Sequence, residues 1–107
     1  MQFSLGMDIV YIPRFKAMTK DAAESVFHSH ELRGSQAEHL AGIFAAKEAF
    51  FKALGKKIGW LDISVEYKES GRPFLNSSLL DAEQKVVLSI SHDGDYAVAT
   101  VVIFNNI

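Results

Sequence analysis

The chain has 107 residues, 49% of them hydrophobic and 22% charged, which predicts one globular domain over residues 1–107. The formal net charge of −2 argues against general binding to nucleic acid. The absence of cysteine excludes disulfides, thiolate metal sites and a cysteine nucleophile. The N-terminus has no basic, apolar leader, and no stretch is long enough to span a membrane, so we expect a cytoplasmic protein without a membrane partner.

Residues 2–12 alternate in the manner of a half-buried strand, with an apolar face made by Phe3, Leu5, Met7, Ile9 and Tyr11. Asp8 lies on the other face and is unusual there, because aspartate is depleted in strands. It is either a carboxylate that accepts hydrogen bonds at a bulge, or a metal ligand or catalytic group. Pro13 ends the strand, and we expect the basic segment that begins at Arg14 to be helical.

A second short helix is predicted over residues 19–30, with Thr19 or Asp21 as its cap. His28, His30 and Glu31 together suggest zinc. Residues two apart point to different sides of a helix, however, and this argues against a zinc site.

The central helix is predicted over residues 40–55, where apolar residues recur with helical spacing and Gly55 supplies a left-handed stop. Ser35 and Glu38 are expected to form a capping box before it. His39 is expected at the surface.

Three charged residues, Lys47, Glu48 and Lys52, are set into this mostly apolar helix. Glu48 and Lys52 are four residues apart, so both side chains rise from one face. They form either an ordinary exposed salt bridge or a chemically active pair.

The C-terminal half is predicted to be mainly strand. Residues 60–68 alternate as a strand, residues 70–73 form a turn, and residues 76–78 can cap one helical turn that runs through Glu83. Residues 86–91 and 96–104 are two strands joined by a type I′ turn at Asp93-Gly94, which places His92 opposite Asp95. Taken alone, His92 and Asp95 are explained as a cross-strand pair that closes the hairpin. Together, the elements predict an α+β domain with a small antiparallel sheet packed on one long helix.

Four segments in this order resemble one family. They are Gly6-Met7-Asp8-Ile9; FAAKEAF from Phe44 with Lys52, Ala53, Leu54 and Gly55; Gly71-Arg72-Pro73; and Ser89-Ile90-Ser91-His92 with Tyr96-Ala97-Val98-Ala99. The chain resembles the small 4′-phosphopantetheinyl transferases of the holo-acyl-carrier-protein synthase type along nearly its whole length.

The resemblance implies transfer of 4′-phosphopantetheine from coenzyme A to a serine of an apo acyl carrier protein, with release of adenosine 3′,5′-bisphosphate. It implies that Asp8 and Glu48 bind Mg²⁺, that Glu48 takes the serine proton directly or through water, and that Lys52 neutralises the phosphates. These three residues are the predicted catalytic set.

The resemblance also implies contacts with both substrates and a homotrimer that holds coenzyme A between neighbouring protomers. We expect the strand from Ala97 to Phe104 to offer surface for the trimer. The predicted contacts with coenzyme A are Lys47, Gly55, Arg72, Pro73 and His92. The predicted carrier-protein surface comprises Arg14, Lys16, Met18 and Lys20.

Two residues depart from the family pattern. Tyr11 stands where an acid is usual, which would remove a carboxylate from the surroundings of the metal. Ile43 stands where an arginine is usual and is either a core residue or a cause of weak discrimination between coenzyme A and its 3′-dephospho form. Two other functions stay open: a catalytically silent module that binds carrier protein or nucleotide, and an assembly subunit without a small-molecule site.

Overall fold

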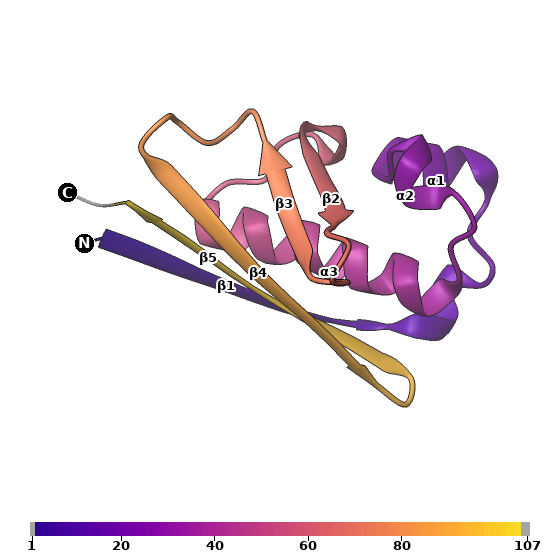
Figure 1. Cartoon of the computed structure of the whole chain (residues 1–107). Helices are drawn as coiled ribbons and strands as arrows, with labels where there is room; N and C mark the ends of the chain where they lie inside the picture. Colours follow the sequence, from indigo (N-terminus) through magenta and orange to yellow (C-terminus); the bar gives the residue numbers. More distant parts are fainter. Residues whose placement is uncertain (1, 106–107) are drawn as a thin grey trace.

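The computed structural model describes residues 2–105, so the predicted domain over residues 1–107 extends beyond the described residues at both ends. The elements, in chain order, are β1 (Gln2–Tyr11), η1 (Ile12–Phe15), α1 (Lys20–Val26), α2 (Ser29–Leu32), α3 (Ala37–Leu54), η2 (Trp60–Asp62), β2 (Ile63–Tyr67), β3 (Pro73–Ser77), β4 (Gln84–Asp93) and β5 (Tyr96–Asn105) (Figure 1). Among the described residues, no helix combines the length and apolar character needed to cross a membrane.

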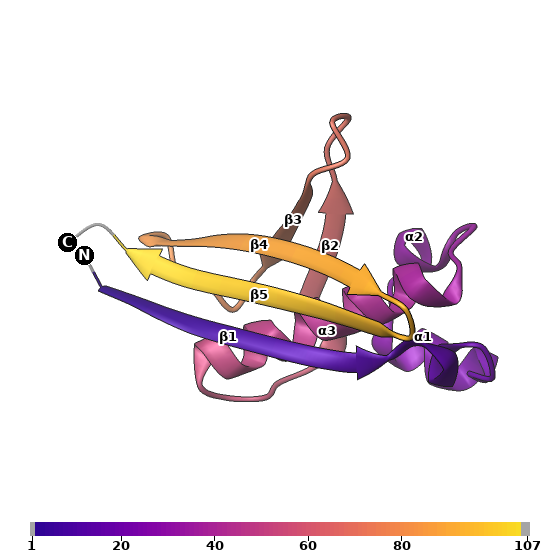
Figure 2. The same cartoon turned by 90° about the horizontal axis from the view of Figure 1, so that it is seen from below.

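The strands form two antiparallel sheets. One has three strands in the order β1-β5-β4, and the other pairs β2 with β3. Figure 2 shows α3 running along one face of the three-stranded sheet, with the β2–β3 hairpin rising beside it. The predicted α+β class and the long helix are confirmed, but the strands divide into two sheets instead of one.

Small residues allow α3 and the sheet to approach closely. On α3, Ala45 and Ala49 are fully buried, and Ala97 and Ala99 are fully buried on the facing side of β5. A Cβ atom at Gly6 would lie 1.8 Å from the carbonyl oxygen of Ala49, so only glycine lets β1 cross the helix here. This crossing brings the part of β1 after Gly6 against the second half of α3.

The apolar face of β1 is not the face that packs on the helix. Gly6 and Val10 are buried against the core, whereas the other face is largely exposed at Phe3, Leu5, Met7, Ile9 and Tyr11. The alternation was therefore predicted, but the strand presents its large apolar side chains to the outside. Large exposed apolar patches of this kind mark interaction surfaces.

The segment between β1 and α3 is less helical than predicted. The helix expected from Arg14 is only the short η1, which contains Pro13. The helix predicted over residues 19–30 divides into α1 and α2 at Phe27 and His28. Thr19 does cap α1, since its hydroxyl oxygen accepts a hydrogen bond from the amide of Ala22 at 3.2 Å. The capping box of Ser35 with Glu38 is wrong: the N-cap of α3 is Gln36.

The C-terminal hairpin is correct in outline but shifted in register. Asp93 pairs with Tyr96, and His92 lies opposite Ala97, so the loop residues are Gly94 and Asp95. Gly94 alone has a positive φ of 58°, as a type II′ turn requires at its first central position, and the predicted type I′ turn is wrong. The shift is two residues, so each side chain keeps its predicted face.

The predicted helical turn through Glu83 is also wrong, because residues 78–83 form turns between β3 and β4, and residues 73–77 form β3. Pro73 takes the first position of this strand, where a missing amide proton is tolerated. The predicted strand over residues 60–68 is shorter than expected and follows the η2 turn.

Candidate active site

Lys52 of α3 and Asp8 of β1 form the centre of the candidate site. The Lys52 Nζ donates hydrogen bonds to Asp8 Oδ1 and to the carbonyl oxygen of Met7, each at 3.0 Å. The Asp8 side chain is only 14% exposed, while that of Lys52 is 53% exposed. Asp8 is therefore a partly buried carboxylate with a half-exposed cationic partner, and it is not part of a β-bulge.

Glu48 lies one helical turn before Lys52 on the same side of α3. Its Oε1 accepts from the ammonium of Lys57 at 2.9 Å, and its side chain is 21% exposed. The predicted alternative of an ordinary Glu48–Lys52 salt bridge is not what forms, because Lys52 turns to β1 and Lys57 reaches back to Glu48. The site thus holds two carboxylates and two lysines at the crossing of β1 and α3.

These residues fit Mg²⁺ by their chemistry. Asp8 and Glu48 offer hard carboxylate oxygens at a partly open surface, and both already hold a cation. No group of three or more metal-binding side chains occurs among residues 2–105. Mg²⁺ is commonly bound by one or two carboxylates together with substrate phosphates and water, so two carboxylates suffice.

Lys47 lies in the core and does not fit the predicted nucleotide contact. Its side chain is fully buried, and its Nζ donates to Glu31 Oε1 at 2.8 Å and to the carbonyl oxygen of Val26 at 2.7 Å. Burial lowers the pKa of Lys47, and the hydrogen bond to the Glu31 carboxylate opposes this shift. In this position the ammonium holds α1, α2 and α3 together.

Glu31 completes this buried network. Its Oε1 also accepts from the amide of His28 at 2.7 Å, and its Oε2 accepts from the amide of Val65 at 2.9 Å. The sequence associated Glu31 with a possible zinc site, but both of its carboxylate oxygens accept hydrogen bonds from the Lys47 ammonium and from backbone amides. The rings of His28 and His30 stack with their centroids 5.4 Å apart, so the expectation that they point to different sides is wrong, because α2 begins only after His28.

Two predicted nucleotide contacts come together in a shallow pocket of about 240 Å³, here called the His92 pocket. It is lined by Glu38, His39, Gly42, Tyr67, Gly71, Pro73, Ile90 and His92. Pro73 and His92 are thus neighbours across β3 and β4. Arg72 is exposed and lies in the adjoining turn, outside the lining residues.

Gly55 lies at the other end of α3, where its φ of 85° ends the helix as predicted. The His92 pocket includes Gly42, which precedes Lys52 by ten residues on α3, or about 15 Å along the axis. Within one chain, the Asp8–Glu48 centre and the His92 pocket therefore lie apart.

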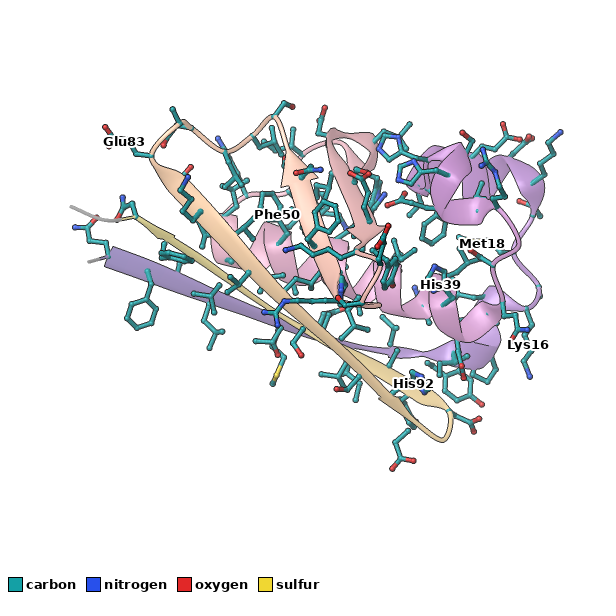
Figure 3. The ribbon with its side chains drawn as sticks, in the orientation of Figure 1. Lys16, Met18, His39, Phe50, Glu83 and His92 are labelled. Carbon is teal, nitrogen blue, oxygen red and sulfur yellow. The ribbon has the colours of Figure 1, made fainter. Side chains whose placement is uncertain are left out.

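The predicted carrier-protein residues lie around η1 and the start of α1. The guanidinium of Arg14 is 5.1 Å from the centroid of Phe44 and 5.4 Å from that of Phe15, so its exposed charge has an aromatic support. Lys16 and Lys20 are exposed, and Met18 is half-buried. Figure 3 shows Lys16 and Met18 close together at one end of the molecule. Lys20 lies 3.8 Å from Glu24 in an exposed pair.

The structure places both residues that depart from the family pattern. Ile43 is fully buried in the core, so the core interpretation is correct. Tyr11 is 46% exposed on the outer face of β1, where its ring lies 5.6 Å from that of Tyr96, and the strand separates it from Asp8. His39, expected at the surface, is instead half-buried in the His92 pocket beside Tyr67.

Comparisons with known proteins show the family of this chain. A sequence model of the 4′-phosphopantetheinyl transferase superfamily matches residues 4–101, and the chain belongs to this family. It is 37% identical over 110 residues to a holo-[acyl-carrier-protein] synthase of Nautilia profundicola, covering 92% of this chain and 97% of that protein.

Solved structures give the same result. A holo-(acyl-carrier-protein) synthase of Bacillus anthracis in complex with CoA (3′,5′-ADP) superposes with a TM-score of 0.85 at 35% identity, covering 96% of both chains. The enzyme of Helicobacter pylori in complex with coenzyme A gives 0.84 at 32% identity, covering 94% of this chain and 99% of that one.

Proposed function

We propose that this protein is a holo-acyl-carrier-protein synthase, which transfers 4′-phosphopantetheine from coenzyme A to a serine of an apo acyl carrier protein and releases adenosine 3′,5′-bisphosphate. The observation that carries this proposal is the meeting of Asp8, Glu48 and Lys52 at one crossing of β1 and α3. The similar enzymes of B. anthracis and H. pylori, crystallised with coenzyme A or its nucleotide part, support the donor.

The residues take distinct parts in this reaction. Glu48 accepts the proton of the carrier serine, directly or through water, as the hydroxyl attacks the phosphorus atom. Lys52 leaves Asp8 for the phosphate oxygens and neutralises the charge that develops on the leaving group. Asp8 and Glu48 would hold Mg²⁺, which supplies charge neutralisation and alignment of the phosphates when bound. Release of Lys52 from Asp8 is favoured once another cation occupies the carboxylate.

We propose further that the active protein is a homotrimer whose site is shared between protomers. Gly42 of the His92 pocket precedes Glu48 by six residues, or about 9 Å along the helix axis, and precedes Lys52 by about 15 Å. This separation supports a shared site, because a second chain can bring its own His92 pocket beside the first chain's carboxylates. The outer face of β1 supports it as well, since Leu5 is 60% and Ile9 62% exposed. Burial of such side chains drives association.

Subunit complementation tests the shared site. Glu48→Gln disables the carboxylate centre, and His92→Ala weakens the His92 pocket. Each variant alone should therefore have low activity. Refolding an equal mixture should restore activity, because some interfaces then combine an intact carboxylate centre with an intact His92 pocket. A mixture that gives only the average of the two variants would rule out sharing.

The carrier protein is proposed to dock on Arg14, Lys16, Met18 and Lys20, where exposed cations surround a half-buried apolar side chain. Acyl carrier proteins are acidic, so this surface complements them in charge. Since such carriers are cytoplasmic proteins, we expect this protein in the same compartment.

Measurement of the intact mass of an apo carrier protein distinguishes a synthase from the catalytically silent module that only binds carrier protein or nucleotide. Incubation with coenzyme A and Mg²⁺ should add the mass of one phosphopantetheine, and a panel of fatty acid and polyketide carriers should identify the preferred one. Binding of carrier without any gain in mass would favour the silent module. Absence of both binding and transfer would favour the assembly subunit.

A further inference from the structure

The ring of His39 is held in the wall of the His92 pocket by Tyr67. The two ring centroids are 5.1 Å apart with an interplanar angle of 34°. Partial burial raises the pKa of Tyr67, and the Glu31 carboxylate adds to this shift, so the phenol stays neutral. In Figure 3, His39 and His92 lie at the same end of the molecule, opposite Glu83. Tyr67 thus fixes an imidazole beside the residues predicted to contact the nucleotide.

The titratable side chains that line this pocket are unusual for a phosphate site. Its titratable lining groups are Glu38 and His39 from α3, Tyr67 from β2 and His92 from β4, and no lysine or arginine is among them. Ile43, where the resembled family usually has an arginine, lies one turn after His39 and is fully buried. The two imidazoles are therefore the lining groups that can carry positive charge.

The two imidazoles differ in their partners. His92 Nε2 lies 3.7 Å from Glu38 Oε1, so a carboxylate already lies beside this nitrogen and would repel an anion there. Among the described residues, no carboxylate oxygen lies within 4.0 Å of a ring nitrogen of His39. His39 is consequently the imidazole whose nitrogen atoms are available to an anion.

We propose that His39 binds the 3′-phosphate of the adenosine part of coenzyme A and sets the preference for coenzyme A over 3′-dephospho-coenzyme A. This inference rests on the proposed function and names one specificity residue for it. An imidazole donates a hydrogen bond to a phosphate oxygen in either protonation state, and its protonated form adds charge. Glu38 repels the phosphate from the His92 side of the pocket and so favours the His39 side.

The test compares two donors in three variants. His39→Phe keeps an aromatic ring against Tyr67 and removes both nitrogen atoms, whereas His39→Gln keeps an N–H donor. His30→Phe is the matched control, because His30 is an exposed histidine outside the pocket, bonded to the Ser64 hydroxyl at 3.0 Å.

For His39→Phe, we expect the ratio of kcat/KM for coenzyme A to that for 3′-dephospho-coenzyme A to fall about tenfold or more, the loss expected for one charge-assisted hydrogen bond. The change should lie in KM for coenzyme A, with kcat nearly constant. His39→Gln should recover part of the ratio, and His30→Phe should keep all of it. An unchanged ratio in His39→Phe would overturn the inference.

Calorimetry without a carrier separates this inference from the proposed function. The wild-type protein should bind adenosine 3′,5′-bisphosphate more tightly than adenosine 5′-monophosphate, and His39→Phe should remove most of that difference. If the protein does so but transfers nothing to any carrier, the inference holds and the proposed function fails. If the wild-type protein shows no preference for the 3′-phosphate, the inference fails whatever the result for transfer.

Discussion

Lys52 and Asp8 join α3 to β1 through an ion pair of 3.0 Å, one helical turn from Glu48. Because the pair is partly exposed, its contribution to stability is modest, at about 0.2–1 kcal/mol. Its significance is that a cation already occupies the carboxylate predicted to bind Mg²⁺. Replacement of Lys52 by Mg²⁺ at Asp8 is therefore part of the proposed mechanism.

The first prediction concerns this carboxylate pair. Asp8→Asn and Glu48→Gln should each lower kcat/KM by about 100-fold or more, because the amides keep the shape of the side chains and lose the charge. Each should also raise the Mg²⁺ concentration needed for half-maximal activity, measured by titration. Glu83→Gln, at the far end of the molecule from His92 (Figure 3), is the control and should behave as wild type. Normal rates at low Mg²⁺ in either variant would remove that residue from the site.

The second prediction concerns the buried pair of Lys47 and Glu31. Lys47→Met leaves the Glu31 carboxylate buried without its cation and should lower the free energy of unfolding by about 3–5 kcal/mol. The double variant Glu31→Gln/Lys47→Met carries no buried charge and should recover part of this loss. Urea denaturation measures both, with the exposed Lys56→Met as control. Equal stability of Lys47→Met and wild type would contradict the burial of this pair.

The same pair predicts a dependence on pH. Since burial lowers the pKa of Lys47 from its ordinary 10.5, the folded protein gives up this proton at a lower pH than the unfolded chain does. Between the two pKa values the unfolded state binds more protons, so the contribution of Lys47 to stability rises with pH. The stability of wild type relative to Glu31→Gln/Lys47→Met should therefore increase towards pH 10. A fall over that range would show that the pKa of Lys47 is raised in the folded state.

The third prediction concerns the carrier surface. Arg14→Glu should raise KM for the carrier far more than KM for coenzyme A, because Arg14 projects an exposed charge from η1. The effect should shrink as the salt concentration rises. Lys85→Glu makes the same charge change at the start of β4 and should leave both constants unchanged. Equal changes in the two KM values for Arg14→Glu would mean that Arg14 does not act on carrier binding alone. It would then act through the stability of the fold or through the transition state that both substrates share.

The fourth prediction concerns the exposed sheet face. Ile9→Asp should convert a trimer to monomers and abolish most activity, with little change in the folding of each monomer, because Ile9 is 62% exposed in the single chain. Light scattering and circular dichroism measure the two effects. Ala82→Asp adds the same charge to an exposed position in the turn before β4, outside the sheet, as the control. A wild-type monomer with full activity would defeat the shared site.

The fifth prediction reverses one expectation from the sequence. Because Ile43 is fully buried, Ile43→Arg should destabilise the protein by several kcal/mol and should not sharpen the preference for coenzyme A. Thermal unfolding and kcat/KM for the two donors test this. A stable variant with stronger preference for coenzyme A would mean that position 43 reaches the ligand.

The sequence predicted those features that depend on local pattern. The alternation in β1, the helical spacing before Gly55 and the small residues of β5 are all local, and each was found in the structure. Where two local signals compete, the prediction failed. Pro73 and Asn76-Ser77-Ser78 are typical of turns and caps, yet pairing with β2 makes this segment a strand. Asp93-Gly94-Asp95 allows two turn positions, and the strand pairing selects the second.

The site was harder to predict, because its side chains find partners far along the chain. Lys47 is next to Glu48 in sequence, but its partner Glu31 is 16 residues away and draws it into the core. Lys52 pairs across 44 residues with Asp8 instead of with its helical neighbour. Nothing in the sequence around His39 predicts that Tyr67 lies beside it. The only available sign was its position one turn before Ile43, where the family arginine is missing.

The most direct test of the account measures the intact mass of an apo carrier protein and the adenosine 3′,5′-bisphosphate released in the same reaction. With wild-type protein, coenzyme A and Mg²⁺, the two should appear in equal amounts, and a carrier whose acceptor serine is replaced by alanine should gain nothing. Glu48→Gln should give neither product while remaining folded. A folded wild-type protein that modifies no carrier in the panel, or a Glu48→Gln variant that modifies it at the wild-type rate, would contradict the account.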